Sequence, residues 1–139
     1  MPITHIELSR PWSKEEKERL AVFVHDTLVE VLKIPEHDRL IRITDYSPDN
    51  FFTPPNGGDD YALFQISLFP GRTLDAKRAL YKKLAEGMQQ FGIAANDTRV
   101  VLNEVPMDGW GIRGGQAGSD VFAEPKKEPW RGFKRRQDV

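Results

Sequence analysis

The second residue of the chain is a proline, and it can do chemistry once the initiator methionine is removed. Removal of Met1 exposes Pro2 as a secondary amine. Ordinary α-amino groups titrate at about pH 8, and burial or nearby cations lower that value because they disfavour the ammonium form. A base that titrates near neutrality can abstract a proton next to a carbonyl group. Pro2 is therefore a candidate acid/base, although in most chains a proline at this position is only an N-terminal residue.

Two arginines have the charge and shape to bind a carboxylate. Arg72 lies in the segment FPGRTLDAKRAL (69–80), and Arg99 lies in TRVVLNEV (98–105). A guanidinium group binds a carboxylate as a two-pronged fork, and its charge stabilises an enolate as it forms. The alternative for each residue is an ordinary surface arginine, at a helix start or in a strand.

The composition restricts the class of protein and of partner. The chain has 139 residues, of which 39% are hydrophobic and 29% charged, as expected for one globular domain. A formal net charge of −1 gives no reason to expect nucleic acid or an anionic membrane as partner. There is no cysteine, and the opening MPITHIELSRPW lacks the pattern of a signal peptide. We therefore expect a cytoplasmic protein that binds neither nucleic acid nor membrane.

The helices and strands that must position Pro2 and the arginines are predicted by an internal sequence repeat. Sliding the chain by 60 residues aligns Ser13 with Thr73, and both residue types cap helices. Ser13 with Glu16 forms a capping-box pattern. One helix is expected to run from Ser13 to before Pro35, and the other from Thr73 to Gly92. Alternating segments predict strands at 3–8, 39–46, 61–68 and 98–105.

This repeat predicts a duplicated βαβ unit, at about 2–46 and 61–105. We expect an α/β chain, in the form of an α+β sandwich, with a four-stranded mixed sheet and both helices on one face. The other face then needs cover from a second subunit, so a homo-oligomer is expected. The domain is predicted over 1–119, and 120–139 is predicted to be a basic C-terminal tail.

Two segments fall outside the repeat. The loop 47–60 is rich in proline and glycine and carries Phe51 and Phe52, which form either a lid over a site or hydrophobic plugs. The tail is either a solvated end or an arm that packs on a neighbouring subunit through Trp130 and Phe133.

Three motifs resemble the tautomerase superfamily. FPGRTLDAKRAL (69–80) resembles the Gly-Arg-Ser/Thr motif that opens a helix in 4-oxalocrotonate tautomerase. TRVVLNEVPMDGWGIRGG (98–115) resembles a later strand of that enzyme and the glycine-rich turn after it. IPEHDR (34–39) resembles the segment of malonate semialdehyde decarboxylase that carries its active-site aspartate. With the Met-Pro opening, the resemblance spans about residues 2–118 and implies a homotrimer of two-unit chains.

The resemblance assigns roles to five residues. Pro2 matches the catalytic proline, Arg72 the arginine of the helix-opening motif, and Asp38 the decarboxylase aspartate. Arg99 matches a strand arginine that binds carboxylate, and Trp110 stands where the family has an active-site phenylalanine. For Asp38 the alternative is a turn residue, and for Trp110 it is a core anchor at a subunit contact. Phe51 is added as a candidate wall of the substrate site.

The sequence also departs from the family pattern. Trp12 stands where the first repeat would have a counterpart of Arg72, and Ala62 stands opposite Pro2 in the second repeat. One of the two decarboxylase arginines is missing, since Pro70 and Gly71 precede Arg72. Because Ala62 lies inside the chain and has no free amine, we expect one catalytic amine per chain. The three histidines show no ligand spacing, so neither a metal nor a cofactor is expected.

Three functions remain open from the sequence. The first is a tautomerase of small 2-oxo carboxylic acids, in which neutral Pro2 moves the proton. The second is a decarboxylase or hydratase of a 3-oxo acid, in which cationic Pro2 works with Asp38 and Arg72. The third is a non-catalytic binding protein on the same scaffold, a reading that gains if Met1 stays attached and blocks the amine.

Overall fold

The computed structural model describes residues 2–122. The described residues form two compact units, one of residues 2–68 with Arg72–Asn103, and one of Phe69–Gly71 with residues 104–122. A four-stranded sheet has the strand order β2-β1-β3-β4. Its strands are β1 (Ile3–Leu8), β2 (Ile41–Asp45), β3 (Ala62–Leu68) and β4 (Thr98–Glu104). β1 runs parallel to β2 and antiparallel to β3, which confirms the mixed sheet.

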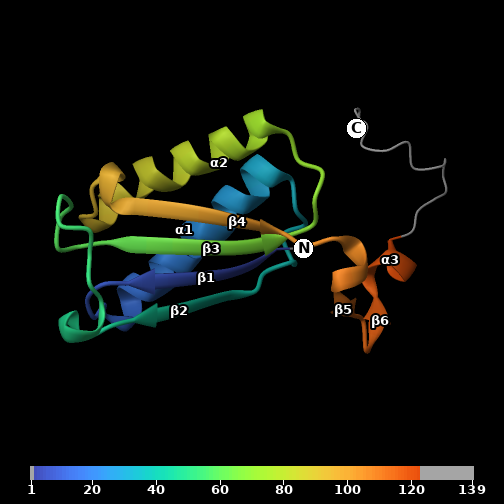
Figure 1. Cartoon of the computed structure of the whole chain (residues 1–139), viewed down its shortest axis with the longest axis horizontal. Coiled ribbons are helices and arrows are strands. Elements are labelled where there is room, and N and C mark those ends of the chain that lie inside the picture. Colours follow the sequence, from blue (N-terminus) through green and yellow to red (C-terminus); the bar gives the residue numbers. More distant parts are fainter. Residues whose placement is uncertain (1, 123–139) are drawn as a thin grey trace. The chain divides into compact units, whose positions relative to one another are not determined.

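Two long helices, α1 (Lys14–Leu32) and α2 (Leu74–Gly87), lie on the same face of this sheet (Figure 1). The predicted caps are confirmed, because Ser13 and Glu16 form a capping box and the Thr73 side chain accepts the Ala76 N–H. The second helix was predicted to reach Gly92 without a break. In the structure its last turn tightens into a 3₁₀ helix, η2 (Met88–Phe91), and Gly92 ends it at φ 86°.

The core lies between the helices and the sheet. Side chains alternate along β1, where Ile6 and Leu8 point into the core and are fully buried. They meet Leu20, Val24 and Leu28 of α1, Phe64, Ile66 and Leu68 of β3, and Leu80 and Leu84 of α2. In the part of the first unit that the structure describes, residues 2–68 and 72–103, no helix covers the other face of the sheet (Figure 1). Val101 of β4, on that face, is 42% exposed.

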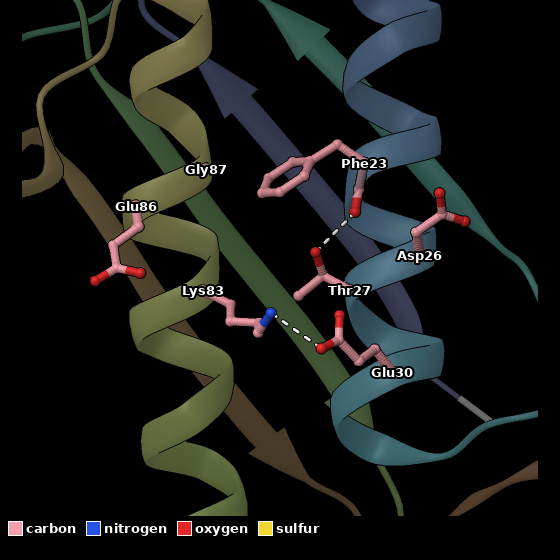
Figure 2. Close-up of a pocket in the computed structure, with 7 residues that line it drawn as sticks. All are labelled: Phe23, Asp26, Thr27, Glu30, Lys83, Glu86 and Gly87. Carbon is pink, nitrogen blue, oxygen red and sulfur yellow. Dashed lines mark hydrogen bonds and ion pairs between the residues drawn. The ribbon is translucent and has the colours of Figure 1, made fainter.

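The helices approach each other closely where Gly87 faces Phe23 (Figure 2). A Cβ on Gly87 would lie 2.0 Å from the Phe23 ring, so a larger residue cannot be accommodated without moving the ring. The groove beside this contact has a volume of about 420 Å³. An ion pair between Lys83 Nζ and Glu30 Oε2, 3.0 Å long, spans it. The groove is therefore part of the helix–helix packing.

Asp45, the last residue of β2, ties the start of α1 to the sheet. Its Oδ2 accepts the backbone N–H of Trp12 at 2.9 Å and lies 3.0 Å from Lys17 Nζ. The Trp12 hydrogen bond and then the Lys17 ammonium lower the pKa of Asp45 below its ordinary value of 3.8. A carboxylate with a lowered pKa stabilises the folded state above its unfolded-state pKa, and this contribution is lost as the pH falls through the folded-state pKa.

We expect Asp45→Ala to lower the free energy of unfolding by about 2 kcal/mol at neutral pH. The loss should shrink in acid, as the pH falls through the lowered folded-state pKa of Asp45 and its carboxylate takes up a proton. Urea unfolding at the two pH values measures this. Asp75→Ala is the matched control, because Asp75 pairs with Arg78 at 2.8 Å while its side chain is 88% exposed, and it should change stability little. Equal losses for both variants, or a loss independent of pH, would refute the assignment.

The second unit contains three short elements that the sequence analysis did not predict. β5 (Gly111–Ile112) pairs antiparallel with β6 (Gln116–Ala117), and α3 (Gly118–Val121) follows. Elements of two to four residues are too short to show a hydrophobic period. Besides η2, the described residues form 3₁₀ turns at η1 (Pro48–Asn50), η3 (Ala95–Asp97) and η4 (Met107–Gly109). The expected tail, with Trp130 and Phe133, lies beyond residue 122 and so outside the described residues. No helix in the described part is long and apolar enough to cross a bilayer.

Candidate active site

Pro2 lies at one end of the sheet, directly before β1, and is buried. The Thr4 N–H donates to the Leu40 carbonyl at 3.0 Å, so the ladder between β1 and the chain before β2 continues to this end. The register pairs Thr4 with Ile41 and Ile3 with Ser67. If this register is continued from Ile3 to Pro2, Pro2 lies between the last residue of β3, Leu68, and the chain that enters β2.

Asp38 lies in the turn that enters β2, at the same end of the sheet. Its N–H donates to the Pro35 carbonyl at 3.0 Å, which closes the turn, and its side chain is half-buried. Leu40, whose carbonyl is held by β1, is two positions further along the chain. Neighbouring strands of a sheet are about 4.8 Å apart, so the turn brings Asp38 to the neighbourhood of Pro2.

Arg72 reaches the same end from the chain that follows β3. One of its guanidinium nitrogens, Nη2, donates to the carbonyl of Leu32, the last residue of α1, at 3.1 Å. The side chain is half-buried. Because the turn with Asp38 begins where α1 ends, the structure brings Pro2, Asp38 and Arg72 to one end of the first unit. A positive charge there also complements the helix C-terminus.

Arg99 and Phe51 lie at the opposite end of the sheet. Arg99 is the second residue of β4, is exposed, and has its guanidinium carbon 5.9 Å from the centre of the Tyr61 ring. Phe51 lies 6.3 Å from the same ring. The Tyr61 carbonyl accepts the N–H of Ser9 at 3.1 Å, just beyond the end of β1. The six residues of β1 therefore separate Arg99 from Pro2 of its own chain, a span of about 20 Å.

This opposite end also holds a hydrogen bond between Tyr46 and Glu7. The Tyr46 hydroxyl donates to the Glu7 carboxylate, and this hydrogen bond, with burial, raises the pKa of Tyr46 above its ordinary value. The Tyr46 ring stands edge-on to Phe51, with ring centres 5.4 Å apart. Tyr46, Phe51, Tyr61 and Arg99 thus form one aromatic and basic cluster, which we call the distal cluster.

Trp110 belongs to the second unit and is buried within it. Its indole N–H donates to the Val105 carbonyl at 3.0 Å. Its ring stands edge-on to Phe69, with centres 5.0 Å apart. Both contacts lie within the second unit, where they hold Trp110 beside the turn that carries β5 and β6.

Comparison with known proteins places the chain in a family. Two family models, both described as "Tautomerase enzyme", match residues 38–113 and residues 2–58. The chain belongs to the tautomerase family. A probable tautomerase of Bacillus subtilis (strain 168), YusQ, is 25% identical to it over 123 residues, which cover 84% of this chain and 97% of the relative.

Solved tautomerase-superfamily structures share the fold. The crystal structure of FG41 malonate semialdehyde decarboxylase inhibited by 3-bromopropiolate matches with a TM-score of 0.77 and 24% identity, over 90% of this chain and 99% of that one. A fused 4-OT, described as a wild-type symmetric trimer, matches with a TM-score of 0.78 and 21% identity, over 86% of this chain and 98% of that one. At these identities the likeness establishes the fold.

In this tautomerase, the residues that stand opposite Arg72 and Asp38 in the other repeat are used for packing. Trp12, which stands in the place of Arg72, is buried and packs on Phe91 with ring centres 5.3 Å apart. Asp97, the repeat partner of Asp38, is 8% exposed and accepts the Gly58 N–H at 3.1 Å. A Cβ on Gly58 would lie 2.6 Å from the Asp97 carboxylate, so glycine is required there.

Asp97 therefore anchors the loop 47–60, a role that the sequence analysis did not predict. The pair Gly57-Gly58 was the available signal, because paired glycines often mark a close backbone approach. The partner 39 residues away could not be identified from the sequence. Among the described residues no group of three or more histidines and carboxylates is placed to hold a metal ion.

Proposed function

We propose that this chain is a tautomerase that interconverts the keto and enol forms of a small 2-oxo carboxylic acid, without a cofactor, using Pro2 as the acid/base. The observation that carries this proposal is the burial of Pro2 at the end of the sheet to which Asp38 and Arg72 also come. Family membership supports the reaction class. Removal of Met1 is required, because the Pro2 nitrogen is otherwise an amide without basicity.

In the proposed reaction, the neutral amine of Pro2 takes a proton from the carbon next to the substrate carbonyl. The electron pair left behind forms the enol double bond, and charge develops on the carbonyl oxygen. A nearby guanidinium stabilises that charge. The Pro2 ammonium then gives the proton to the carbonyl oxygen, which completes the enol. In the opposite direction Pro2 takes the proton from the enol oxygen and gives it to the carbon. Arg72, whose Nη2 donates to the Leu32 carbonyl at 3.1 Å, is the guanidinium proposed to hold the substrate carboxylate, because its planar fork matches the two carboxylate oxygens.

We propose that the distal cluster completes the Pro2 site of a neighbouring subunit in a homotrimer. Within one chain Arg99 and Phe51 lie about 20 Å from Pro2, so they serve a site only across a subunit contact. The uncovered sheet face of the first unit and the trimeric assembly of the fused 4-OT support this arrangement. Trp110 is proposed as a wall of the same site.

The second candidate is decarboxylation or hydration of a 3-oxo acid. It is supported by the presence of Asp38 at the Pro2 end and by the similarity to FG41 malonate semialdehyde decarboxylase. In that reaction Pro2 would act as a cation, and Asp38 would orient a water or the substrate. The pKa of Pro2 separates the two candidates, because base chemistry needs a value below that of an ordinary α-amine and acid chemistry needs a value above it.

The test is the enol–keto conversion of phenylpyruvate by purified protein as a function of pH. We expect kcat/KM to rise through one ionisation near neutrality, as Pro2 loses its proton, and mass spectrometry to find chains without Met1. A rate no higher than that of buffer, together with turnover of malonate semialdehyde, would replace the first candidate by the second. Mostly intact Met1 would rule out both and leave a binding protein.

A further inference from the structure

A histidine on α1 holds the turn that carries Asp38. The Nε2 atom of His25 lies 2.7 Å from the backbone carbonyl of Glu36. A carbonyl can only accept, so Nε2 carries the hydrogen and His25 is the donor. Its Nδ1 is buried and has no hydrogen-bond partner among residues 2–122. The geometry therefore requires a hydrogen on Nε2 and gives the ring one task, which is to hold the Glu36 carbonyl.

This bond links α1 to the turn that carries Asp38. The link between α1 and β2 begins at Lys33, in the left-handed conformation at φ 60°, and closes with the bond from the Asp38 N–H to Pro35. His25 holds the carbonyl between these two points, and the Thr4 N–H holds the carbonyl of Leu40 two residues beyond Asp38. Asp38 thus lies between two fixed carbonyls, one held by the helix and one by the sheet.

We propose that His25 is a positioning residue for Asp38: through its bond to Glu36 it holds the Asp38 carboxylate at the Pro2 end of the sheet. This inference rests on the proposed function, in which the part of Asp38 is to orient the substrate beside Pro2, or a water in the second candidate. The inference goes beyond the proposed function because it assigns a role to a residue of α1 that does not contact the substrate. The sequence shows three scattered histidines, and only the fold separates His25 from His5 and His37.

The test compares His25→Leu, which removes the donor, with His25→Gln, whose side-chain amide nitrogen can take the place of Nε2. We expect His25→Leu to lower kcat about 10-fold with little change in KM, because the substrate still binds but Asp38 is misplaced. His25→Gln should recover most of the rate, and His37→Leu, an exposed neighbour in the same turn, should match the native protein. Equal activity of His25→Leu and native protein would overturn the proposal.

A double variant separates positioning from general damage. If His25 acts through Asp38, His25→Leu should change kcat less than 2-fold when Asp38 is already alanine. The same 10-fold loss in both backgrounds would mean that His25 acts by another route, and the proposal would fail.

Amide hydrogen exchange of the turn keeps the inference testable if the proposed function is wrong. In His25→Leu, but not in His25→Gln, the Asp38 and Arg39 amides should exchange faster, because their hydrogen bonds belong to the released turn. This result would support the positioning role even in a protein that turns over neither substrate. Unchanged exchange in His25→Leu would refute it, whatever the activity.

Discussion

Replacing Pro2 with alanine is expected to lower kcat/KM for phenylpyruvate by at least about 100-fold, within the range that general acid–base catalysis contributes. The alanine variant still has an N-terminal amine, but this amine is primary and is not held by a ring. Its pKa and its direction at the end of β1 both change. The measurement is the pH dependence of kcat/KM for native protein and variant, and the ionisation seen in the native profile should be missing or moved in the variant.

A second variant tests the amine itself while Pro2 stays in place. Insertion of a lysine between Met1 and Pro2 should retain the methionine, because a large second residue blocks its removal, and should turn the Pro2 nitrogen into an amide. We expect no activity above buffer and an unchanged thermal unfolding midpoint. A variant that is folded and as active as the native protein would show that the amine of Pro2 is not the base, and the proposed mechanism would have to be abandoned.

The helices and strands of the first unit were predictable because their signals are local. Ser13 with Glu16 and Thr73 gave both helix starts to the residue, since the capping side chain and the backbone N–H that it accepts are three residues apart. The duplication gave the strands and the two-layer arrangement. Predicted strand ends were off by one or two residues, as for 39–46 against Ile41–Asp45, because alternation continues past the last ladder bond.

The site was only partly predictable, because strand register is not local. The sequence brought Pro2, Asp38 and Arg72 together through the family pattern, and the register is consistent with that grouping. It did not say where Arg99 lies. β3 runs antiparallel to β1, so the residues around Tyr61, at its beginning, stand at the far end from Pro2, and Arg99 packs there. Which end a residue occupies depends on strand direction, whereas alternation fixes only the face.

The hydrogen bond from His25 to Glu36 is a second feature that the sequence pattern could not predict, because it too depends on the path of the chain in space. Eleven residues separate the two partners, and they meet because α1 ends at Leu32 and the chain turns back along the helix. No periodicity marks the pair, since His25 is a partly buried polar residue on a helix whose pattern is set by its apolar neighbours. Side-chain bonds to the backbone of a turn are visible only once the turn is known.

Replacing Arg99 with alanine is expected to lower kcat/KM for phenylpyruvate about 100-fold, equivalent to about 2.7 kcal/mol of binding to the substrate carboxylate. The loss should appear mainly in KM, because the role proposed for Arg99 is to bind the substrate carboxylate and not to move the proton. Arg78→Ala is the matched control, since Arg78 is an exposed arginine that pairs with Asp75 on α2, and it should leave the rate unchanged.

Co-expression of two inactive variants then tests whether the site is shared between subunits. If each site takes Pro2 from one chain and Arg99 from its neighbour in a closed ring, random assembly of equal amounts of Pro2→Ala and Arg99→Ala chains leaves one site in four with both residues. About a quarter of the native activity should return, although neither variant is active alone. If Arg99 served the Pro2 site of its own chain, no mixed oligomer would hold an intact site and no activity would return. The span of β1 between the two residues makes the first outcome the expected one.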